Sequence, residues 1–553
     1  MPNEGTTPSS RRENNNVPPN TVDIEEPEEK KSLITRLIIY LKILRKYFVI
    51  EPLLVLWLLP SCFFLIAIPN LALEKACRVN LGYNKLICDN VLEKSEDIDC
   101  DVFEESSYDK IIENVFNITN NSTDFNYVVC KAELETQKAV TFINGVRGPV
   151  SSVFQVIVIL YAGNLSDRLG KRKPLMLLPL IGEFLSALAL LISSIYFDEI
   201  PMEFGAFLEK LLPGLLGGPT LMIMGVYSYL IATTKEEDRV FRLGIFGMCL
   251  TIITIVGSPF SGTLYTQLGY VNVFILGAVL LACGILYLFL FVKEVEQTEA
   301  KDVKKEKFSC KEGLLVAYDS SKVLIKKREN DGRKYLILLT ICYFLLIGPA
   351  NGEADLLYPY TLIRLNFNGD DFSYFYTFSQ AIAACGTFIM TTILSKMLKV
   401  TDAMIGLLAS ICSVIARVCF AFAKEYILYY AGGVFDMFVV ARTISLKTII
   451  SLFVLPEELG RIYSVLGIAD ALGTFIFTPM YSSLYNATVA NFPGAFYLFS
   501  EIFLVPSSFI FFIVYLLLRK RKPPPSDPEG KGENGIDNIA MDDKNPDTMD
   551  THL

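Results

Sequence analysis

Twelve long apolar stretches dominate the sequence, and each is long enough to cross a lipid bilayer as a helix. A membrane-spanning helix needs about 20 apolar residues, because the hydrocarbon core is about 30 Å thick. Hydrophobic residues make up 52% of the 553-residue chain, too many over too great a length for an ordinary soluble enzyme. We therefore expect an all-α membrane protein with twelve transmembrane helices. The predicted spans are 52–73, 142–162, 174–196, 205–232, 243–265, 270–292, 335–363, 373–395, 402–422, 426–454, 462–485 and 494–518.

Polar segments separate these spans into two groups of six. The amino-terminal segment is rich in Asn, Pro and Glu, and such a composition cannot bury enough apolar surface to fold. The predicted organisation is a disordered cytoplasmic head at 1–50, an N-terminal six-helix half at 51–292 that includes a glycosylated extracellular loop at 75–140, a cytoplasmic central loop at 293–334, a C-terminal six-helix half at 335–518 and a disordered cytoplasmic tail at 519–553.

Lys and Arg are distributed unevenly between the connections. They gather after the even-numbered spans, at 168–173, 235–242 and 519–522, whereas the short connections on the other side hold almost none. Cytoplasmic connections of membrane proteins carry the excess of Lys and Arg. The asymmetry therefore predicts that both termini are cytoplasmic.

Glycosylation triplets and cysteines mark the opposite side of the membrane. One N-x-Ser/Thr triplet, at Asn164, falls in a predicted cytoplasmic connection and is a chance match. Four cysteines of the loop 75–140 predict two disulfides in an oxidising compartment, and three pairings stay open. The predicted glycosylation sites are Asn117, Asn120, Asn121 and Asn486, and the disulfide candidates are Cys77, Cys88, Cys100 and Cys130.

Composition and motifs argue against several classes of protein. The formal net charge of −9 gives no overall basic footprint for nucleic acid. The single histidine, His552, lies in the polar tail, so a histidine metal site or a Ser/His pair inside the membrane is not available. No GxxxxGK[ST] motif for ATP occurs. We expect no enzymatic activity, no cofactor and no nucleic-acid partner.

The connection between the second and third spans carries the most specific motif. Residues 163–173 have the form G-x-x-x-D-R-x-G-[KR]-[KR]-[KR], which resembles the cytoplasmic loop signature of the major facilitator superfamily. Its glycines permit close backbone approach, and its cations suit a helix carboxyl end. The alternative is a plain basic cytoplasmic loop. The resemblance implies that these residues latch and release neighbouring helices: Gly163, Asp167, Arg168, Gly170, Lys171, Arg172 and Lys173.

A second charged motif occurs in matching places of the two predicted halves. Glu236-Glu237-Asp-Arg239 follows the fourth span, and Glu457-Glu458-Leu-Gly-Arg461 follows the tenth. Internal repeats are common in transporters whose halves rock about a central site. Chance similarity is the alternative, because the counterpart of the first motif at 395–399 is degenerate. We expect Arg239, Glu457 and Arg461 to take part in conformational gating.

Charged residues inside the spans are candidates for substrate binding or coupling, because each is costly in hydrocarbon unless it is paired or faces water. Arg442 lies near the middle of the tenth span, where Asp436 and Lys447 share a different helix face. In the seventh span, Pro349 and Gly352 predict a broken helix beside Glu353 and Asp355. Further candidates, for which simple interhelical pairing is an equal alternative, are Glu183, Arg417, Asp470 and Glu501.

Four stretches resemble solute carrier family 46, the family of the proton-coupled folate transporter: 163–173, Arg239–Arg242, Asp355-Leu-Leu, and Arg442 with Lys447. The resemblance implies that Arg442 serves in substrate binding or proton coupling, and that Asp167 serves in the conformational cycle. Three of the family's functional positions differ. Ala232 and Gly247 replace acidic residues and Ala350 replaces a histidine. Glu353 or Asp355 is the candidate to replace that histidine as proton carrier.

The sequence favours a secondary active transporter that carries a small organic solute by alternating access. An organic anion, folate-like compounds included, is the favoured substrate, and protons the favoured coupling ion. A facilitative uniporter and a non-transporting receptor on the same fold are the alternatives. The expected partners are the solute, protons and the lipid bilayer, and a monomer is expected. The plasma membrane is favoured, while Glu29-Lys-Lys-Ser-Leu33-Ile34 resembles an acidic dileucine signal for endosomes or lysosomes.

Overall fold

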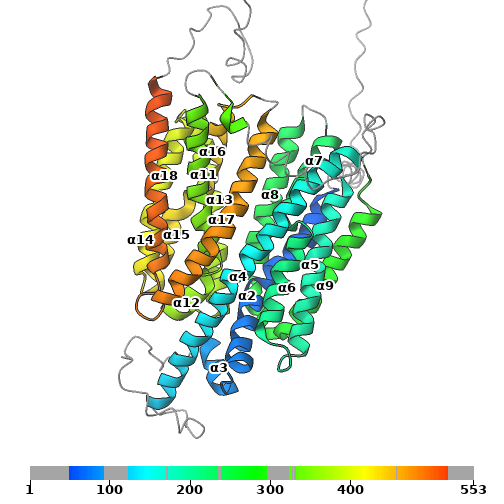
Figure 1. The fold of residues 1–553 in the computed structure, drawn as a ribbon, viewed down its shortest axis with the longest axis vertical. Helices are drawn as coiled ribbons and strands as arrows, with labels where there is room; N and C mark the ends of the chain where they lie inside the picture. Colours follow the sequence, from blue (N-terminus) through cyan, green and yellow to red (C-terminus); the bar gives the residue numbers. More distant parts are fainter. Residues whose placement is uncertain are drawn as a thin grey trace, which may run out of the picture. The chain divides into compact units, whose positions relative to one another are not determined.

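The computed structural model describes residues 49–92, 123–169, 172–234, 238–294, 323–326, 328, 332–455 and 458–520, with the backbone alone at 123–124, 160–169, 240, 459–460, 464 and 520. Every regular element in these ranges is a helix (Figure 1). The prediction of an all-α protein is therefore confirmed. Residues Leu53–Leu553 form one compact unit, and the contacts described below lie within it.

The helices that precede residue 295 correspond to the first six predicted spans. They are α2 (Glu51–Lys75) with its π-helical extension (Ala76–Asn80), α3 (Lys85–Leu92), α4 (Thr123–Leu169), α5 (Lys173–Ile195), α6 (Met202–Leu215), α7 (Gly218–Thr233), α8 (Arg239–Gly257) and α9 (Phe260–Leu290). The predicted span 205–232 is not one continuous helix. Gly217 and Gly218 both have positive φ angles, of 92° and 56°, and separate α6 from α7.

The helices that follow residue 331 correspond to the last six predicted spans. They are α11 (Gly332–Ala354), α12 (Leu357–Leu365), α13 (Gly369–Phe388) with its π-helical extension η7 (Ile389–Met397), α14 (Asp402–Phe422), α15 (Tyr426–Phe435), the 3-10 turn η8 (Asp436–Phe438), α16 (Val439–Ser451), α17 (Leu459–Thr488) and α18 (Ala495–Lys520).

Ten helices or joined helices in the described ranges are long and apolar enough to cross a membrane. The fifth predicted span is represented by the shorter apolar helix Phe241–Gly257. Its predicted end, residue 265, lies inside α9, and Gly269, which follows it, is a non-helical residue within α9 (φ 73°, ψ 171°). The tenth span is divided by η8 into two short helices. The total of twelve spans, the two six-helix halves and the cytoplasmic side of the termini stay predictions.

Two expectations about helix continuity were wrong in detail. The span 426–454 is not one straight helix, because η8 interrupts it at Asp436. Asp436 and Lys447 therefore do not share one face of a single helix. The seventh span is broken as expected, but at Asp355 and Leu356 rather than at Pro349 and Gly352. Gly352 instead lets α11 approach α17, since a Cβ there would lie 2.6 Å from the Tyr481 ring.

Helices from the two sides of the central loop meet along two seams. α4 packs against α17, and α13 packs against α8 and α9. The polar contacts of these seams gather at the end of the helices where α3 lies, which we call the α3 end (Figure 1). There, Gln137 of α4 donates to the Pro359 carbonyl (3.1 Å) and accepts from the Tyr485 hydroxyl (2.8 Å).

The second seam is equally close at the α3 end. The Gly262 amide donates to Ser373 Oγ (3.1 Å), and Thr263 Oγ1 donates to Asp370 Oδ1 (3.3 Å). The Tyr358 hydroxyl also donates to Asn70. Toward the opposite end, a Cβ added at Gly244, Gly247 or Gly467 would meet no atom of a described residue within 4 Å. Hydrogen bonds therefore join the two seams at the α3 end, where a cavity of about 380 Å³ lies beside them, lined by residues that include Asn70, Tyr265 and Asp370.

Candidate functional site

Arg417 of α14 organises a buried ion-pair network among the helices that follow the central loop. Its guanidinium lies 3.2 Å from a carboxylate oxygen of Glu353 in α11 and 2.7 Å from one of Asp436 in η8. Arg417 is 7% exposed and Glu353 is 5% exposed. Breaking such a pair would leave an uncompensated buried charge, so the three helices are held together at this point.

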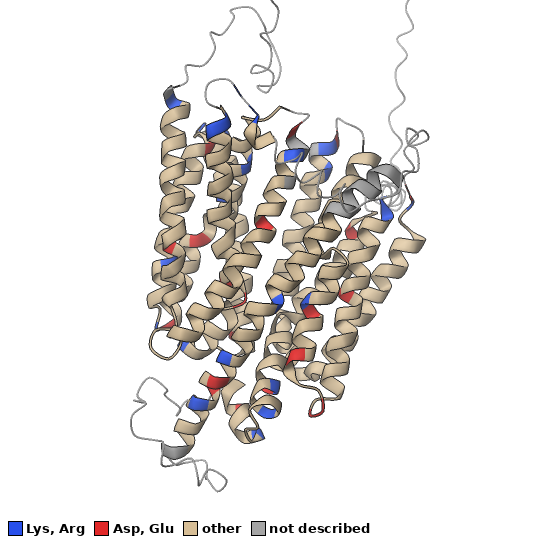
Figure 2. Cartoon of the chain, in the orientation of Figure 1, with Lys and Arg blue, Asp and Glu red and all other residues tan. Residues whose placement is uncertain are grey.

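Neutral hydroxyl groups complete the coordination of the two carboxylates. Ser500 of α18 donates to Glu353 and is itself hydrogen bonded to Tyr481 of α17 (2.7 Å). Ser413 of α14 donates to Asp436 (3.0 Å). The break at η8 is what turns the Asp436 carboxylate toward α14. Figure 2 shows that charged residues occur inside the helix bundle as well as at its ends.

Arg442 of α16 lies beside this network but is not neutralised by a direct pair. It is 2% exposed, and its Nε and Nη1 atoms are buried without a hydrogen-bond partner among the described residues. Its charge is within electrostatic range of Arg417, Asp436 and Glu353. A buried guanidinium with unused donors is able to bind an anion through charge-assisted hydrogen bonds.

Glu501 of α18 resembles Arg442 in that its charged atoms are buried and have no hydrogen-bond partner among the described residues. Both of its carboxylate oxygens are buried without a hydrogen-bond partner in the part of the chain that the structure describes. The charges of Arg417, Glu353 and Arg442 act on it. We call Glu353, Arg417, Asp436, Arg442 and Glu501 the buried charge cluster.

Three of the five predicted substrate or coupling residues meet in this cluster: Arg442, Glu353 and Asp436. In the described ranges, no hydrogen bond or ion pair joins the other two, Asp355 and Lys447, to it. Asp355 instead interacts electrostatically with Lys210 of α6. The Lys447 ammonium lies over the Tyr343 ring, 5.7 Å from its centroid.

A second charged group lies among the helices that precede the central loop. Arg147 of α4 pairs with Glu209 of α6 (2.8 Å), which also lies 3.4 Å from Lys210. Glu183 of α5 is within electrostatic range of Glu209 and Lys210. Sequence reasoning missed Arg147, Glu209 and Lys210. The rule that charges inside apolar spans are costly would have found them, because all three lie within predicted spans.

The motif at 163–173 is only partly described. Gly163, Asp167 and Arg168 belong to α4, which continues to Leu169 instead of ending before the motif, and their side chains lie outside the description, as do Gly170 and Lys171. The backbone amides of Arg172 and Lys173, where α5 begins, donate to Glu294 Oε1 at 2.6 and 3.2 Å. A carboxylate at a helix amino end is favourable because it satisfies free amides and opposes the helix dipole.

The second motif engages the central loop through Glu458. Its carboxylate pairs with Lys326 (2.6 Å) and Arg328 (2.7 Å). Burial alone would raise the pKa of Glu458, but the hydrogen bonds from Lys326 and Arg328 outweigh it and hold that pKa below its ordinary value. Glu457 lies outside the described residues, Arg461 is exposed, and Arg239 begins α8.

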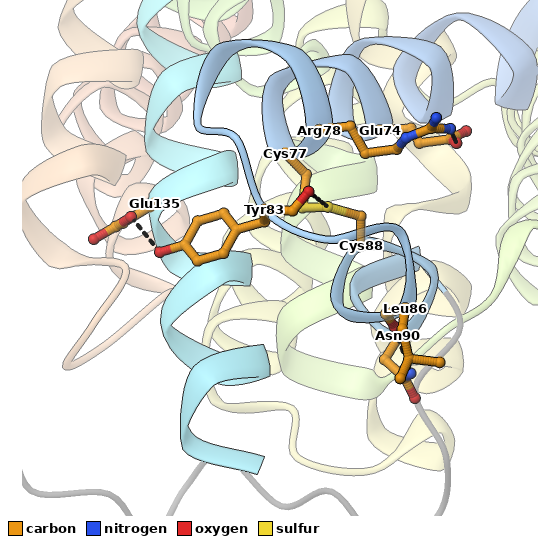
Figure 3. Close-up of a disulfide and its surroundings, with 8 residues drawn as sticks. All are labelled: Glu74, Cys77, Arg78, Tyr83, Leu86, Cys88, Asn90 and Glu135. Atoms are coloured by element: carbon orange, nitrogen blue, oxygen red, sulfur yellow. Dashed lines mark hydrogen bonds and ion pairs between the residues drawn. A yellow bond between two sulfur atoms is a disulfide. The ribbon is translucent and has the colours of Figure 1, made fainter. Parts of the chain in front are cut away.

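A disulfide orders the segment after α2. Cys77 is bonded to Cys88 of α3 (Figure 3). Cys130 of α4 is also disulfide-bonded. The Tyr83 hydroxyl donates to Glu135 (2.7 Å). Burial, reinforced by this carboxylate, raises the pKa of Tyr83.

The predicted glycosylation sites are mostly outside the description, as is the remaining disulfide candidate. Cys100, Asn117, Asn120 and Asn121 all fall between α3 and α4, outside the described residues. Asn486 is described and lies in the last turn of α17 rather than in a connection, because α17 extends to Thr488. Glycosylation at these positions stays a prediction.

Comparison with known proteins supports a transporter. The model of the Major Facilitator Superfamily matches residues 140–478. The lysosomal proton-coupled steroid conjugate and bile acid symporter of Gallus gallus is 23% identical over 422 residues, which cover 73% of this chain and 88% of that protein. The proton-coupled folate transporter of Rattus norvegicus is 24% identical over 358 residues, which cover 63% of this chain and 73% of that protein.

A solved structure gives the same assignment at the level of the fold. The human organic anion transporter MFSD10 (TETRAN) matches with a TM-score of 0.54 at 17% sequence identity, over 84% of this chain and 99% of that one. The relatives agree with the resemblance to solute carrier family 46, and the family model matches more than half of the chain. The chain is therefore a multi-pass membrane transporter rather than an enzyme, and it belongs to the major facilitator superfamily.

Proposed function

We propose that this protein is a secondary active transporter that couples the movement of an organic anion to protons by alternating access. The observation that carries the proposal is Arg442, a buried cation whose Nε and Nη1 have no hydrogen-bond partner among the described residues. Arg417 is occupied by Glu353 and Asp436, which leaves Arg442 as the cation available to an anion. The transported anion would supply the missing acceptors.

The substrate class follows from the cation and from the relatives together. The two relatives are named for steroid conjugates, bile acids and folate. We propose that this chain carries an anion of comparable size, with Arg442 binding its charged group. Folate-like compounds belong to the candidate set.

The contacts at the two ends support an alternating-access cycle. Hydrogen bonds join the seams at the α3 end, and a Cβ added at Gly244, Gly247 or Gly467 toward the other end would meet no described atom within 4 Å. With the orientation predicted from the Lys and Arg distribution, this conformation faces the cytoplasm. Transport then requires the α3-end contacts to break and re-form in each cycle.

The test is uptake into liposomes that contain the purified full-length protein. The panel is labelled folic acid, taurocholate and oestrone sulfate, each at external pH 5.5 and 7.5. We expect uptake of at least one anion and faster uptake at the lower pH. Arg442→Gln should abolish that uptake, whereas Arg519→Gln, the same change at an exposed position in the last turn of α18, should not.

Each alternative predicts a different result of the same assay. A facilitative uniporter would transport an anion equally at both pH values. A receptor would transport none of the panel. Full uptake by the Arg442→Gln variant would overturn the assignment of Arg442, whatever the pH dependence.

We propose the plasma membrane as the site of action and a monomer as the working unit. One relative is named as lysosomal, so the Leu33-Ile34 signal is the specific alternative. Surface biotinylation of the wild type and of Leu33→Ala/Ile34→Ala separates them. An internal protein that reaches the surface only in the double variant would refute the plasma-membrane assignment.

A further inference from the structure

Glu501 is a buried carboxyl group that the ion-pair network leaves unused. Neither of its oxygens accepts a hydrogen bond from a described residue, although both are buried. Keeping an unpaired carboxylate charged in such surroundings is costly, and protonation removes that cost. Its neighbour Ser500 donates to Glu353 instead.

The elements packed against α18 bring a defined set of charges to Glu501. These elements are α14, α11 and α17. α14 supplies Arg417 and α11 supplies Glu353, which pair with each other, and the charge of Arg442 reaches Glu501 from α16. From α17, Tyr481 interacts electrostatically with Glu501, whereas Asp470 accepts a hydrogen bond from Asn351 (3.0 Å).

We propose that Glu501 carries the transported proton and thereby controls the affinity of Arg442 for the anion. The inference rests on the proposed function of proton-coupled anion transport. With a proton on Glu501, the positive charges of Arg417 and Arg442 balance the negative charges of Glu353 and Asp436. Arg442 is then free to bind the anion, which brings the excess negative charge.

Loss of the proton reverses this balance. The ionised Glu501 adds a negative charge close to Arg442, which repels the anion and competes with it for the guanidinium. Anion and proton therefore favour each other's binding, and by linkage the effect is reciprocal. Both enter on the side where protons are more abundant, and both leave on the other side, without any covalent step.

The other candidate acids are less suited to this role. Both Glu353 oxygens are engaged by Arg417, and one of them also by Ser500. Asp355 interacts with Lys210, outside the buried charge cluster. Glu183 also interacts with Lys210, but it lies on α5, among the helices before the central loop.

The experiment compares Glu501→Gln with the matched change Glu183→Gln in liposomes that contain the full-length protein. Two activities are measured with the three-anion panel: uptake driven by a pH gradient, and exchange of labelled for unlabelled anion at equal pH. Glutamine mimics a permanently protonated Glu501. We therefore expect Glu501→Gln to retain exchange and to lose stimulation by the gradient.

The expected size follows from one linked proton. Wild-type anion affinity should change by up to about tenfold per pH unit while Glu501 titrates, because one proton is taken up per anion. In Glu501→Gln the change should fall below about twofold, while Glu183→Gln should keep the wild-type dependence. A pyranine signal inside the liposomes should report anion-driven proton entry for the wild type and for Glu183→Gln, but not for Glu501→Gln.

Each outcome decides the question. Retained gradient stimulation in Glu501→Gln overturns the inference but leaves the proposed function standing. Loss of stimulation in Glu183→Gln alone places the proton on α5 and also overturns it. Absence of uptake by the wild type overturns the proposed function itself. If Glu501→Gln does not fold, Glu501→Asp must retain gradient stimulation with a shifted pH dependence, and failure to do so counts against the inference.

Discussion

Replacing Gly262 with alanine should open the seam between α9 and α13 at the α3 end. The added Cβ would overlap the Asp370 carboxylate and lie 2.8 Å from both the Cα and the backbone nitrogen of Asp370. Contacts below 3.0 Å to backbone cannot be relieved by turning a side chain. The two helices must therefore separate, and the bonds from Gly262 to Ser373 and from Thr263 to Asp370 weaken or break.

The magnitude follows from these contacts. An extra methyl group in a tightly packed contact costs about 1–3 kcal/mol. Two hydrogen bonds contribute about 0.5–1.5 kcal/mol each, and we take one of them as lost. The closed conformation should lose about 2–4 kcal/mol relative to the open one, which is about a 30- to 700-fold change in the equilibrium at 1.4 kcal/mol per tenfold.

The assay measures how fast a reagent added from the α3 side reaches a cysteine that lies deeper in the helix bundle than the α3-end contacts. Thr141 of α4 lies one helical turn after Gln137, is fully buried, and its hydroxyl has no hydrogen-bond partner among the described residues. Thr141→Cys should react slowly with a membrane-impermeant maleimide added from the α3 side. Adding Gly262→Ala should raise the labelling rate by at least about 30-fold while the open state is a minor population.

Gly244→Ala is the matched control, because the same methyl group there meets no atom within 4 Å. It should leave the labelling rate unchanged. Ser373→Ala, which removes one hydrogen bond without a clash, should raise the rate by about 2- to 10-fold. Equal labelling of Gly262→Ala and Gly244→Ala, in protein that reaches the membrane and stays monodisperse, would refute the assignment of this contact as a gate.

Two further predictions concern the ion pairs. Arg417→Met leaves the carboxylates of Glu353 and Asp436 without their ion-pair partner. It should lower the free energy of unfolding by about 3–5 kcal/mol and lower the thermal unfolding midpoint in detergent. Adding Glu353→Gln and Asp436→Asn should recover most of the loss, and an undiminished midpoint in the single variant would contradict this account. The pKa of Glu458 is lowered in the folded protein, so its contact with the central loop is intact above the ordinary carboxyl range and is lost as the pH falls through the lowered value. A spin label at Ile325 should become mobile in the wild type as the pH falls through that lowered pKa, and it should be mobile at every pH in Glu458→Gln. Mobility independent of pH in the wild type would argue against the contact.

Local physical chemistry explains why much of the fold was predictable. A span is recognised from about 20 consecutive apolar residues, a property that needs no knowledge of neighbouring helices. The all-α class was obtained in this way and the family from the resemblance of a local motif, and both are confirmed. The breaks were harder, because Pro349 is accommodated inside α11 while η8 follows residues without a proline. The local sequence does not show whether backbone N–H and C=O groups freed by a helix break can form hydrogen bonds with other residues.

The amino-acid sequence by itself determined that this chain is a helical membrane protein, because apolar length and charge distribution are properties of single segments, and the motif at 163–173 indicated a transporter family by resemblance. It also identified Arg442 and Glu353 as charges inside apolar spans, which are costly in hydrocarbon unless they are paired or face water. Only the tertiary structure decided that Arg417, not Arg442, neutralises Glu353 and Asp436, and that Asp355 turns away toward Lys210. Ion pairs depend on distances of a few ångströms between residues far apart in the chain, and those distances are set by helix packing and by the break at η8.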